Sequence, residues 1–439
     1  MMKIFKFQGG THPPDYKYFA KDIAIETLPL PGKVVVPLAQ HLGVPADATV
    51  KKGDTVKTGQ IIGTARGFIS ATVHSPVSGT VSLVGPVPHP VLGTVQGIEI
   101  TSDGNDDWTE EIKPVDEKSK ENIIKAVQNA GIVGMGGATF PSHVKLQPPP
   151  DKKIDLLILN AAECEPFLTC DYRLMLENGE KIIRGAELLM TALGINKCAI
   201  GIEKNKPKAI VKLEQLTEGR NDIEIIALRT WYPQGGEKQL IYAVTGKEVP
   251  SGGLPMDVGC VVHNVGTAAA IAEAVDEGKP LVERILTVSG DAVERPGNFK
   301  VRIGTPVSEV LATAGFDEEN CAKIVLGGPM TGFAQAKPNA SVMKGTSGIL
   351  ALTKKWVDDK PESACIRCGR CVSACPVGLE PTMLETLAMS REVDGLMENH
   401  AMDCIECGSC SYVCPANRSL VHAIKYGKGQ IMALRKAKK

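Results

Sequence analysis

Two cysteine-rich stretches near the C-terminal end carry the most specific chemistry in this sequence. CIRCGRCVSACP begins at Cys365 and CIECGSCSYVCP begins at Cys404, and each has the spacing C-x2-C-x2-C-x3-C-P. Thiolates at this repeated spacing bind a pair of [4Fe–4S] clusters, and the fourth cysteine of each run ligates the other cluster. We therefore predict one cluster on Cys365, Cys368, Cys371 and Cys414, and a second on Cys404, Cys407, Cys410 and Cys375.

Zinc is the alternative occupant of such sites. Structural zinc sites usually combine two C-x2-C halves, whereas each run here has three cysteines followed by Cys-Pro. Thiolates are soft ligands that suit iron–sulfur centres, so the repeated spacing favours clusters. Because clusters pass electrons singly, we expect the 364 residues before Cys365 to supply a group that loads or unloads them.

Two stretches in the middle of the chain have the residue types that bind a phosphate-bearing cofactor. GIVGMGGATFPSHVK is rich in glycine, which lets a backbone approach a phosphate closely, and LNAAECEP ends a predicted buried strand. Open parallel sheets bind ligands at the carboxyl ends of their strands, so polar residues there are candidates. These candidates are Gly134, Gly136, Gly137, Asn160, Glu163 and Glu165.

Two later stretches add polar candidates. WYPQGGEKQ and VVHNVGTAAA, the second at the start of a predicted apolar helix, add Tyr232, Gly235, Glu237, His263, Asn264 and Thr267. Each stretch also has a purely structural interpretation. The glycines could form a plain turn, Asn264 and Thr267 could cap their helix, and Glu165 could be a solvated turn residue.

The elements that must position these residues form a parallel α/β domain. Predicted helices cover KENIIKAVQNAG, EKIIRGAELLMTALG and KPKAIVKLEQL, and predicted strands cover KIDLLILNA, KCAIGIE and DIEIIALRT. Strands that alternate with helices pack as parallel β-α-β units. The glycine-rich stretch does not connect a strand to a helix, so it lacks the context of a dinucleotide-binding fingerprint.

Predicted β segments flank this domain on both sides. ATVKKGDTVKTGQIIGT and ATVHSPVSGTVSLV alternate apolar and polar residues and resemble the two halves of a biotinyl or lipoyl carrier fold. The hairpin between them, TARGFISAT, has no lysine to carry such a group, so we expect a structural or docking role. A second β-rich segment covers residues 284–315, the stretch IVLGGPMTG follows it, and a loop-like stretch then extends to about Pro361.

Composition argues against several classes of protein. Lys and Arg total 49 against 50 Asp and Glu, and aromatic residues make up 4%, so we expect no nucleic-acid binding. We find no apolar run of membrane-spanning length and expect no signal peptide at the start. Thirteen cysteines, eight of them in the two runs, suit metal-bound thiolates in a reducing cytosol better than disulfides.

Taken together, these motifs resemble those of the Rnf family, in particular its component RnfC. Rnf complexes are membrane-bound, ion-translocating ferredoxin:NAD oxidoreductases, and FQGGTHPPDYK resembles the family's opening motif. The middle of the chain is also similar to the flavin-binding subunit of respiratory complex I. Where that subunit has GRGGAGFPTGLK, NxDExEP, YxxGEE and NNVET, this chain has GMGGATFPSHVK, NAAECEP, YPQGGE and HNVGT.

The resemblance implies an FMN site and an NAD(H) site. Glu165 and Tyr232 would be the catalytic residues that hold the nicotinamide against the flavin ring, and Lys145 would meet flavin phosphate or ring oxygens. The implied cofactor-binding residues are Gly134, Gly136, Gly137, Phe140, Lys145, Asn160, Glu163, Glu165, Tyr232, Gly235, Glu237 and Asn264. The chain departs from the complex I motifs at Met135, Ala162, Gly236 and His263, where an arginine, a carboxylate, a second carboxylate and an asparagine are replaced.

The resemblance also implies the function: one component of an oxidoreductase and translocase, which passes electrons between NAD(H), FMN and two [4Fe–4S] clusters. The other subunits of the complex, including an iron–sulfur subunit, would be its partners. We expect it at the cytoplasmic face of the cell membrane, bound peripherally. The alternatives are a stand-alone NADH-dependent reductase similar to cobalamin reductase, and a cluster-bearing scaffold whose flavin site has decayed.

The expected fold is multidomain, α/β plus β. It combines a barrel-sandwich hybrid, a Rossmann-like parallel α/β flavin domain, a β-grasp domain of the soluble-ligand-binding type and a ferredoxin-like helical module for two [4Fe–4S] clusters. We predict an N-terminal segment and the sandwich at 1–102, a linker at 103–118, the flavin domain at 119–282, the β-grasp domain at 283–333, a connecting segment at 334–360, the cluster module at 361–425 and a basic tail at 426–439. We expect this tail to be solvated, and the alternative is a contact with anionic lipid or an acidic partner.

Overall fold

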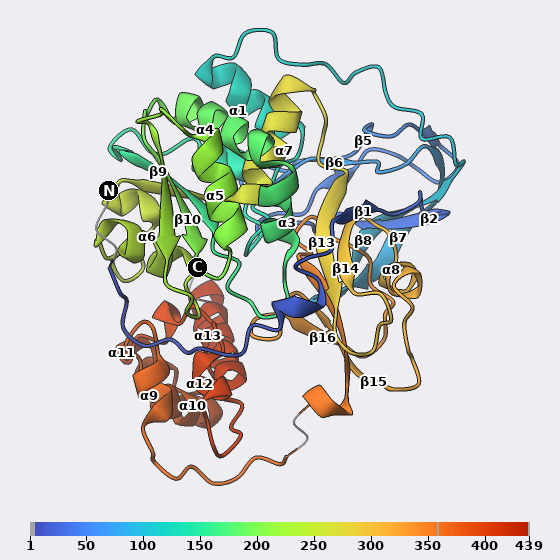
Figure 1. Ribbon diagram of the computed structural model, residues 1–439. Helices are drawn as coiled ribbons and strands as arrows, with labels where there is room; N and C mark the ends of the chain where they lie inside the picture. The colour runs from blue at the N-terminus through green and yellow to red at the C-terminus, as the bar shows by residue number, and fades with distance from the viewer. Residues whose placement is uncertain (1–4, 358–359, 438–439) are drawn as a thin grey trace.

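The computed structural model describes residues 5–357 and 360–437. The outermost residues of the predicted N-terminal segment and basic tail, 1–4 and 438–439, and positions 358–359 of the connecting segment lie outside the described residues. Figure 1 shows the helical module at one end of the molecule, next to the parallel α/β layer, with the β-rich domains on the other side. None of the helices in the described ranges has the length and apolar character needed to cross a bilayer.

The N-terminal β domain is a sandwich of two small antiparallel sheets. One sheet has the order β2 (Lys33–Pro37), β8 (Gly93–Ser102), β7 (Gly79–His89), β4 (Thr55–Val56), and the other has β3 (Asp47–Ala48), β5 (Ile61–Thr64), β6 (Val73–His74). Alternate side chains such as Val34, Val36, Ile98 and Ile100 point inward and are fully buried. This period of two is what the sequence predicted for a half-buried strand.

The second domain contains a sheet of four parallel strands. Their order is β11 (Ile223–Leu228), β10 (Cys198–Glu203), β9 (Leu156–Ala161), β12 (Cys260–Asn264). Helices cover both faces, which is why these strands are continuous apolar runs. One face packs on α6 (Glu237–Thr245), and the other packs on α1 (Lys120–Asn129), α4 (Gly179–Leu193), α5 (Pro207–Leu216) and α7 (Val265–Asp276). The predicted strands and helices of this domain are confirmed.

A six-stranded mixed sheet forms the third domain. Its order is β1 (Ile25–Thr27), β14 (Gly297–Arg302), β13 (Glu283–Ser289), β17 (Gly348–Thr353), β15 (Cys321–Leu326), β16 (Phe333–Gln335), with α8 (Val307–Thr313) packed beside it. Strand β17 corrects our prediction for 334–360, which we expected to be a loop-like connection. Its five apolar or glycine positions Gly348–Leu352 are buried because the strand lies between β13 and β15. Strand β1 shows that part of the N-terminal segment also belongs to this sheet.

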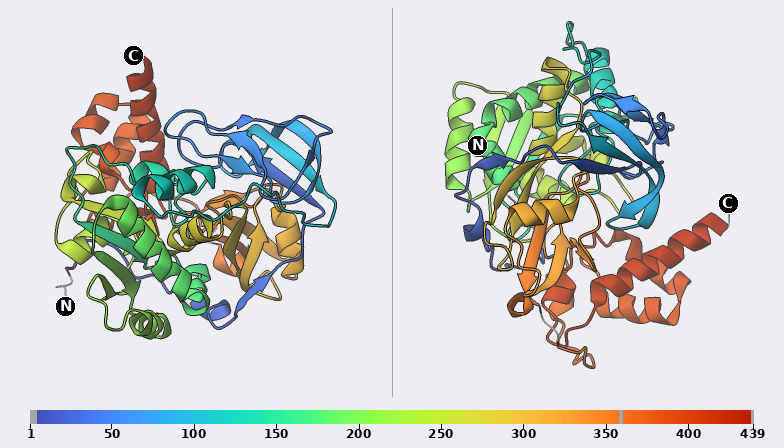
Figure 2. Two further views of the ribbon diagram at one scale, coloured as in Figure 1. Left: turned by 90° about the horizontal axis from the view of Figure 1, so that it is seen from above. Right: turned by 90° about the vertical axis from the view of Figure 1, so that its right-hand side faces the viewer.

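The C-terminal module is helical. The two cysteine runs lead into short helices, α9 (Arg370–Ala374) and α12 (Ser409–Tyr412), and the predicted helical pair between them is α10 (Pro381–Ser390) and α11 (Val393–Glu398). Helix α13 (Leu420–Ala437) is continuous across residue 425, so the structure corrects the separate solvated tail that we expected. The reason is packing, since Ile424, Gly427 and Ile431 are buried against α10 and α11. Figure 2 shows this helix extending from the body of the molecule.

Candidate nucleotide cleft and cysteine sites

A cleft of about 560 Å³ opens where the first three domains meet. This volume lies within the range of cofactor and ligand pockets. Seven of the predicted cofactor-binding residues line it: Gly136, Gly137, Asn160, Glu163, Glu165, Gly235 and Asn264. The sandwich contributes residues 39–42 and 89–92, and the third domain contributes residues 326–328, 331–333, 343 and 345–347, none of which the sequence indicated.

The glycine-rich loop forms one wall of the cleft and is tied down on its far side. The Gly134 N–H donates to the Phe140 carbonyl at 2.9 Å, and the Met135 N–H donates to Thr267 Oγ1 at 3.0 Å. A Cβ at Gly136 would lie 2.8 Å from Asn264 Nδ2, whereas a Cβ at Gly137 would meet no described atom within 4 Å. The loop therefore requires glycine at 136 and leaves the backbone at 137 open to a ligand, as a phosphate-bearing cofactor requires.

The two residues considered as helix caps have different roles. Asn264 does cap α7, because its Oδ1 accepts from the Gly266 N–H at 2.7 Å, and its Nδ2 donates to Asp171 at 2.7 Å. Thr267 holds the glycine-rich loop and is not a cap. Arg284 also supports this loop, since its guanidinium donates to the Met135 carbonyl at 2.9 Å. The buried Arg284 lies far along the chain, so no local pattern indicated this contact.

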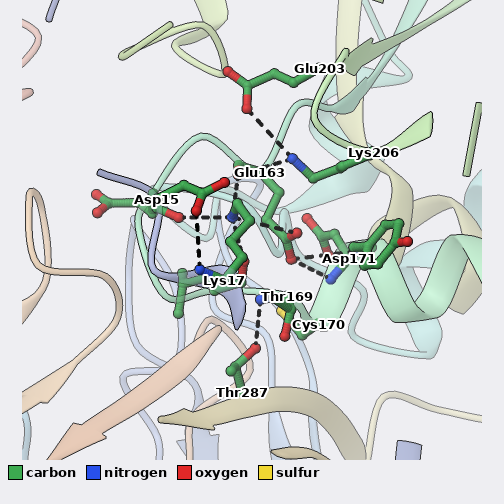
Figure 3. Close-up of polar contacts among 12 residues, drawn as sticks. Asp15, Lys17, Glu163, Thr169, Cys170, Asp171, Glu203, Lys206 and Thr287 are labelled. Atoms are coloured by element: carbon green, nitrogen blue, oxygen red, sulfur yellow. Dashed lines mark hydrogen bonds and ion pairs between the residues drawn. The ribbon is translucent and has the colours of Figure 1, made fainter. Parts of the chain in front are cut away.

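Glu163 is a buried carboxylate at the floor of the cleft. Its side chain is 2% exposed, and its Oε1 accepts from the Asp171 N–H at 2.7 Å. Its Oε2 has no hydrogen-bond partner in residues 5–357 and 360–437, but lies 3.9 Å from Lys17 Nζ. Burial raises the pKa of Glu163 to about 7, and the charges of Lys17 and Lys206 limit the increase. Figure 3 shows these two lysines approaching Glu163 from different sides.

Glu165 is held by the third domain. Its carboxylate accepts from the Met330 N–H at 3.0 Å and from the Thr331 hydroxyl, and a Cβ at Gly328 would lie 2.2 Å from its Oε2. Burial raises the pKa of Glu165, and these hydrogen bonds oppose the increase. The interpretation of Glu165 as a solvated turn residue is therefore wrong, because its carboxylate is bonded at the cleft wall.

Five of the predicted cofactor residues do not line the cleft: Gly134, Phe140, Lys145, Tyr232 and Glu237. Lys145, in the short helix α2 (Ser142–Lys145), donates to Glu237 at 2.7 Å, so each neutralises the other. Tyr232 is 3% exposed, and its hydroxyl donates to the Cys407 carbonyl at 2.7 Å. Tyr232 thus joins the α/β domain to the second cysteine run. We expected it at the cleft wall, and the structure does not place it there.

The two cysteine runs have the same backbone conformation. Arg367 and Glu406, at equivalent positions, both adopt left-handed φ values of 55° and 57°. In each run the N–H of that residue donates to the sulfur two positions earlier, at 3.4 Å. Such N–H to sulfur bonds are among the features that tune iron–sulfur clusters. All thirteen cysteines are free of disulfides, so all eight thiols of the runs are available as ligands.

The fourth cysteine of each run lies near the other run. Burial, together with the nearby thiols of its own run and of Cys375, raises the pKa of Cys410 to about 12. Burial likewise raises the pKa of Cys371, and the thiol of Cys414 adds to the increase. This arrangement fits the crossed ligand sets expected for two clusters. In the first run Cys365 and Cys368 are exposed, whereas the second run packs against the α/β domain through Tyr232.

Known families match the chain along most of its length. The RnfC barrel-sandwich hybrid domain matches residues 5–105, the Nuo51 FMN-binding domain matches 127–273, the SLBB domain matches 285–334 and the 4Fe-4S dicluster domain matches 364–418. These matches confirm the predicted classes of all four domains.

Curated relatives match over nearly the whole chain. The C component of the proton-translocating ferredoxin:NAD(+) oxidoreductase complex of Clostridium ljungdahlii is 50% identical over 97% of this chain and 93% of its own. The C component of the Na(+)-translocating complex of Acetobacterium woodii is 47% identical over 98% of both chains. Among solved structures, the air-oxidized NAD+-reducing [NiFe]-hydrogenase shares the fold, with a TM-score of 0.50 and 20% identity over 72% of this chain and 61% of that one. The chain belongs to the RnfC family, whose members are components of ion-translocating ferredoxin:NAD(+) oxidoreductase complexes.

Proposed function

We propose that this chain is the subunit of a ferredoxin:NAD(+) oxidoreductase complex that exchanges electrons between NAD(H), FMN in the cleft and two [4Fe–4S] clusters on the cysteine runs. The observation that carries the proposal is the contact from the Tyr232 hydroxyl to the Cys407 carbonyl. It joins the domain that forms the cleft floor directly to one of the two cluster sites. Membership of the RnfC family supports the same assignment.

Each residue of the cleft has a task in this proposal. Bound FMN supplies the conversion between a hydride and two single electrons. The open backbone at Gly137 would approach the cofactor phosphate, and Asn160, fixed by its 2.8 Å bond to the Gly235 carbonyl, would help orient the ring. The Glu165 carboxylate would accept hydrogen bonds from the ribose hydroxyls or carboxamide of NAD(H). Apolar side chains of the sandwich, such as Leu42 and Leu92, would exclude water from the outer wall.

The remaining predicted residues hold the cleft together rather than face it. Lys145 and Glu237 form an ion pair, and the Lys145 ammonium also donates to the Val262 carbonyl at 3.1 Å. The four departures from the complex I motifs leave room for a cofactor, since the cleft remains about 560 Å³. This open cleft argues against a scaffold with a decayed flavin site.

The proposed partners are the other subunits of the complex, among them an iron–sulfur subunit, with attachment at the cytoplasmic face of the cell membrane. The names of the relatives, which are subunits of ion-translocating complexes, support this placement. The balance of 49 basic and 50 acidic residues supports a partner other than nucleic acid. A stand-alone reductase fits less well, because the similarity to a component of such a complex covers 97% of the chain.

Cofactor content after anaerobic purification tests the proposal. We expect about one FMN and about eight iron atoms per chain, as two [4Fe–4S] clusters require, and we expect NADH to bleach the flavin absorbance. A protein with full iron and no flavin, even after incubation with FMN, would identify a cluster scaffold instead. A protein that purifies with NADH-reducible flavin but never with membrane subunits would identify the stand-alone reductase.

A further inference from the structure

We propose that Lys17 is a positioning residue for the nucleotide cleft, and that the N-terminal strap, defined as residues 7–17, delivers its ammonium to the loop Glu163–Leu168. The inference rests on the proposed function, since it assigns a task in NAD(H) binding to a residue outside the cleft. The strap is the stretch FQGGTHPPDYK, for which neither the cofactor sites nor the sandwich gives a role.

The strap lies between the cluster module and the α/β domain. The Gly10 N–H donates to the Ala374 carbonyl at 2.9 Å, and Thr11 pairs with Tyr232 through two backbone hydrogen bonds of 2.7 and 2.8 Å. A Cβ at Gly9 would lie 2.4 Å from the Cys375 carbonyl oxygen, so no side chain fits there. The route of the strap is therefore fixed by close backbone contacts on both sides.

At the end of the strap, Lys17 enters the interior. It is 5% exposed, and its Nζ donates to three carbonyls, those of Glu163 at 3.0 Å, Glu165 at 3.1 Å and Leu168. An ammonium group has three donors, so this site uses all of them. The Glu163 carboxylate at 3.9 Å supplies the opposing charge. Figure 3 shows Lys17 surrounded by this loop.

The loop that Lys17 holds needs external support. Glu163 and Phe167 have φ values of 46° and 69°, in the left-handed region that side chains other than glycine rarely adopt. Such backbone persists only where its surroundings impose it. Lys206, which donates to the Ala162 carbonyl at 2.6 Å, fixes the backbone conformation at the start of the loop, and Lys17 fixes the backbone conformation of the remainder.

The same loop presents Glu163 and Glu165 to the cleft. Without Lys17, the Glu165 and Leu168 carbonyls lose their charged donor, and the Glu163 carbonyl keeps only the 3.4 Å bond from Lys206. Buried carbonyls left unpaired must turn toward water. The loop lines the cleft, which water can enter, so the peptide groups would rotate toward the cleft and displace both carboxylates. Lys17 thus touches no ligand itself but sets where the ligand-facing carboxylates stand.

The test compares Lys17→Met, Lys17→Arg and Lys21→Met in the full-length protein. Lys21 is exposed and four residues further on, so it is a matched control for the loss of one lysine. Hydrogen exchange of residues 162–169 reports on the loop, and NADH oxidation with ferricyanide gives KM and kcat per bound FMN. Iron content and melting temperature report on the fold.

We expect Lys17→Met to speed exchange in 162–169 and to raise the KM for NADH about tenfold, the effect of losing about one charged hydrogen bond. The kcat per bound FMN should change less than KM, Lys17→Arg should recover part of the loss, and Lys21→Met should match wild type. Unchanged exchange in Lys17→Met would overturn the proposal, as would faster exchange with an unchanged KM. If Lys17→Met does not fold, Lys17→Arg decides: a raised KM supports positioning, and a wild-type KM overturns it.

Failure of the proposed function would look different. A wild-type protein that binds neither FMN nor NADH would contradict the electron-transfer assignment and, with it, the task in NAD(H) binding. The exchange comparison would still show whether Lys17 holds the loop, and unchanged exchange would overturn that part independently.

Discussion

Replacement of Glu165 by glutamine tests the chemistry of the cleft most directly. The carboxylate has two acceptor oxygens and is bonded to the Met330 N–H at 3.0 Å and to the Thr331 hydroxyl. Glutamine keeps the size of the side chain but offers one acceptor and one donor. Its amide NH2 would therefore face either the Met330 N–H or the Thr331 hydroxyl, and the negative charge is lost in both arrangements.

The magnitude follows from the bonds involved. A hydrogen bond to a charged group contributes about 1.5–3 kcal/mol, which corresponds to roughly a ten- to hundredfold change in affinity or rate. We therefore expect Glu165→Gln to lower kcat/KM for NADH by that factor. The fold and both clusters should remain, because the substitution preserves the volume at a partly buried site.

The assay is NADH-driven reduction of an artificial electron acceptor, with FMN and iron measured in the same samples. Thr331→Val is the matched control, since it removes one hydrogen bond to Glu165 and leaves the charge. It should lower kcat/KM by less than Glu165→Gln. Equal activity of wild type and Glu165→Gln at equal FMN would refute the assignment, and loss of FMN alone would make Glu165 a flavin ligand instead.

Three further outcomes are expected. Cys375→Ser should remove the same paramagnetic cluster signal as Cys404→Ser and leave the one that Cys365→Ser removes; the opposite pairing would contradict the crossed ligands. Tyr232→Phe should leave the Cys407 carbonyl without its donor and weaken the attachment of the cluster module by about 1–3 kcal/mol, measured as faster iron release to a chelator. For Glu163, the native pKa of about 7 lies above the ordinary 4.5, so the native state binds the proton more tightly. The contribution of Glu163 to the free energy of unfolding should therefore fall by about 3 kcal/mol as pH rises from 4.5 to 7. Glu163→Gln should abolish this pH dependence in unfolding experiments.

The α/β domain and the cluster module could be predicted because their signals are local. A buried parallel strand such as β9 is an uninterrupted apolar run, and α4 ends at Gly194 in the left-handed conformation that glycine favours. The cysteine spacing is likewise a property of a few consecutive residues. The seven candidates that line the cleft were found because they lie in the glycine-rich loop or at or after the carboxyl ends of strands.

The missed features depend on contacts distant in sequence. Strand β17 is a six-residue run after a stretch rich in Gly, Pro and Lys, and only its place between β13 and β15 makes it a strand. Lys17 lies among polar residues and prolines, where a lysine is ordinarily solvated, and its burial comes from carbonyls about 150 positions away. The end of helix α13 resembles a solvated tail in the sequence because its many lysines obscure the helical pattern of apolar residues, which includes the buried Ile431.

These distant contacts explain why the cleft depends on so much of the chain. The loop Glu163–Leu168 is held from below by the N-terminal strap through Lys17 and from the side by Met330 and Thr331 of the third domain. The strap also contacts the cluster module at Ala374, and Tyr232 contacts the second cysteine run. A ligand that shifts the loop therefore also acts on the strap, which contacts the cluster module only a few residues before Lys17. These contacts hold the cleft, where two electrons are exchanged together, at a fixed position relative to a cluster site, where electrons pass singly. Electron transfer between FMN and a cluster requires such fixed positions.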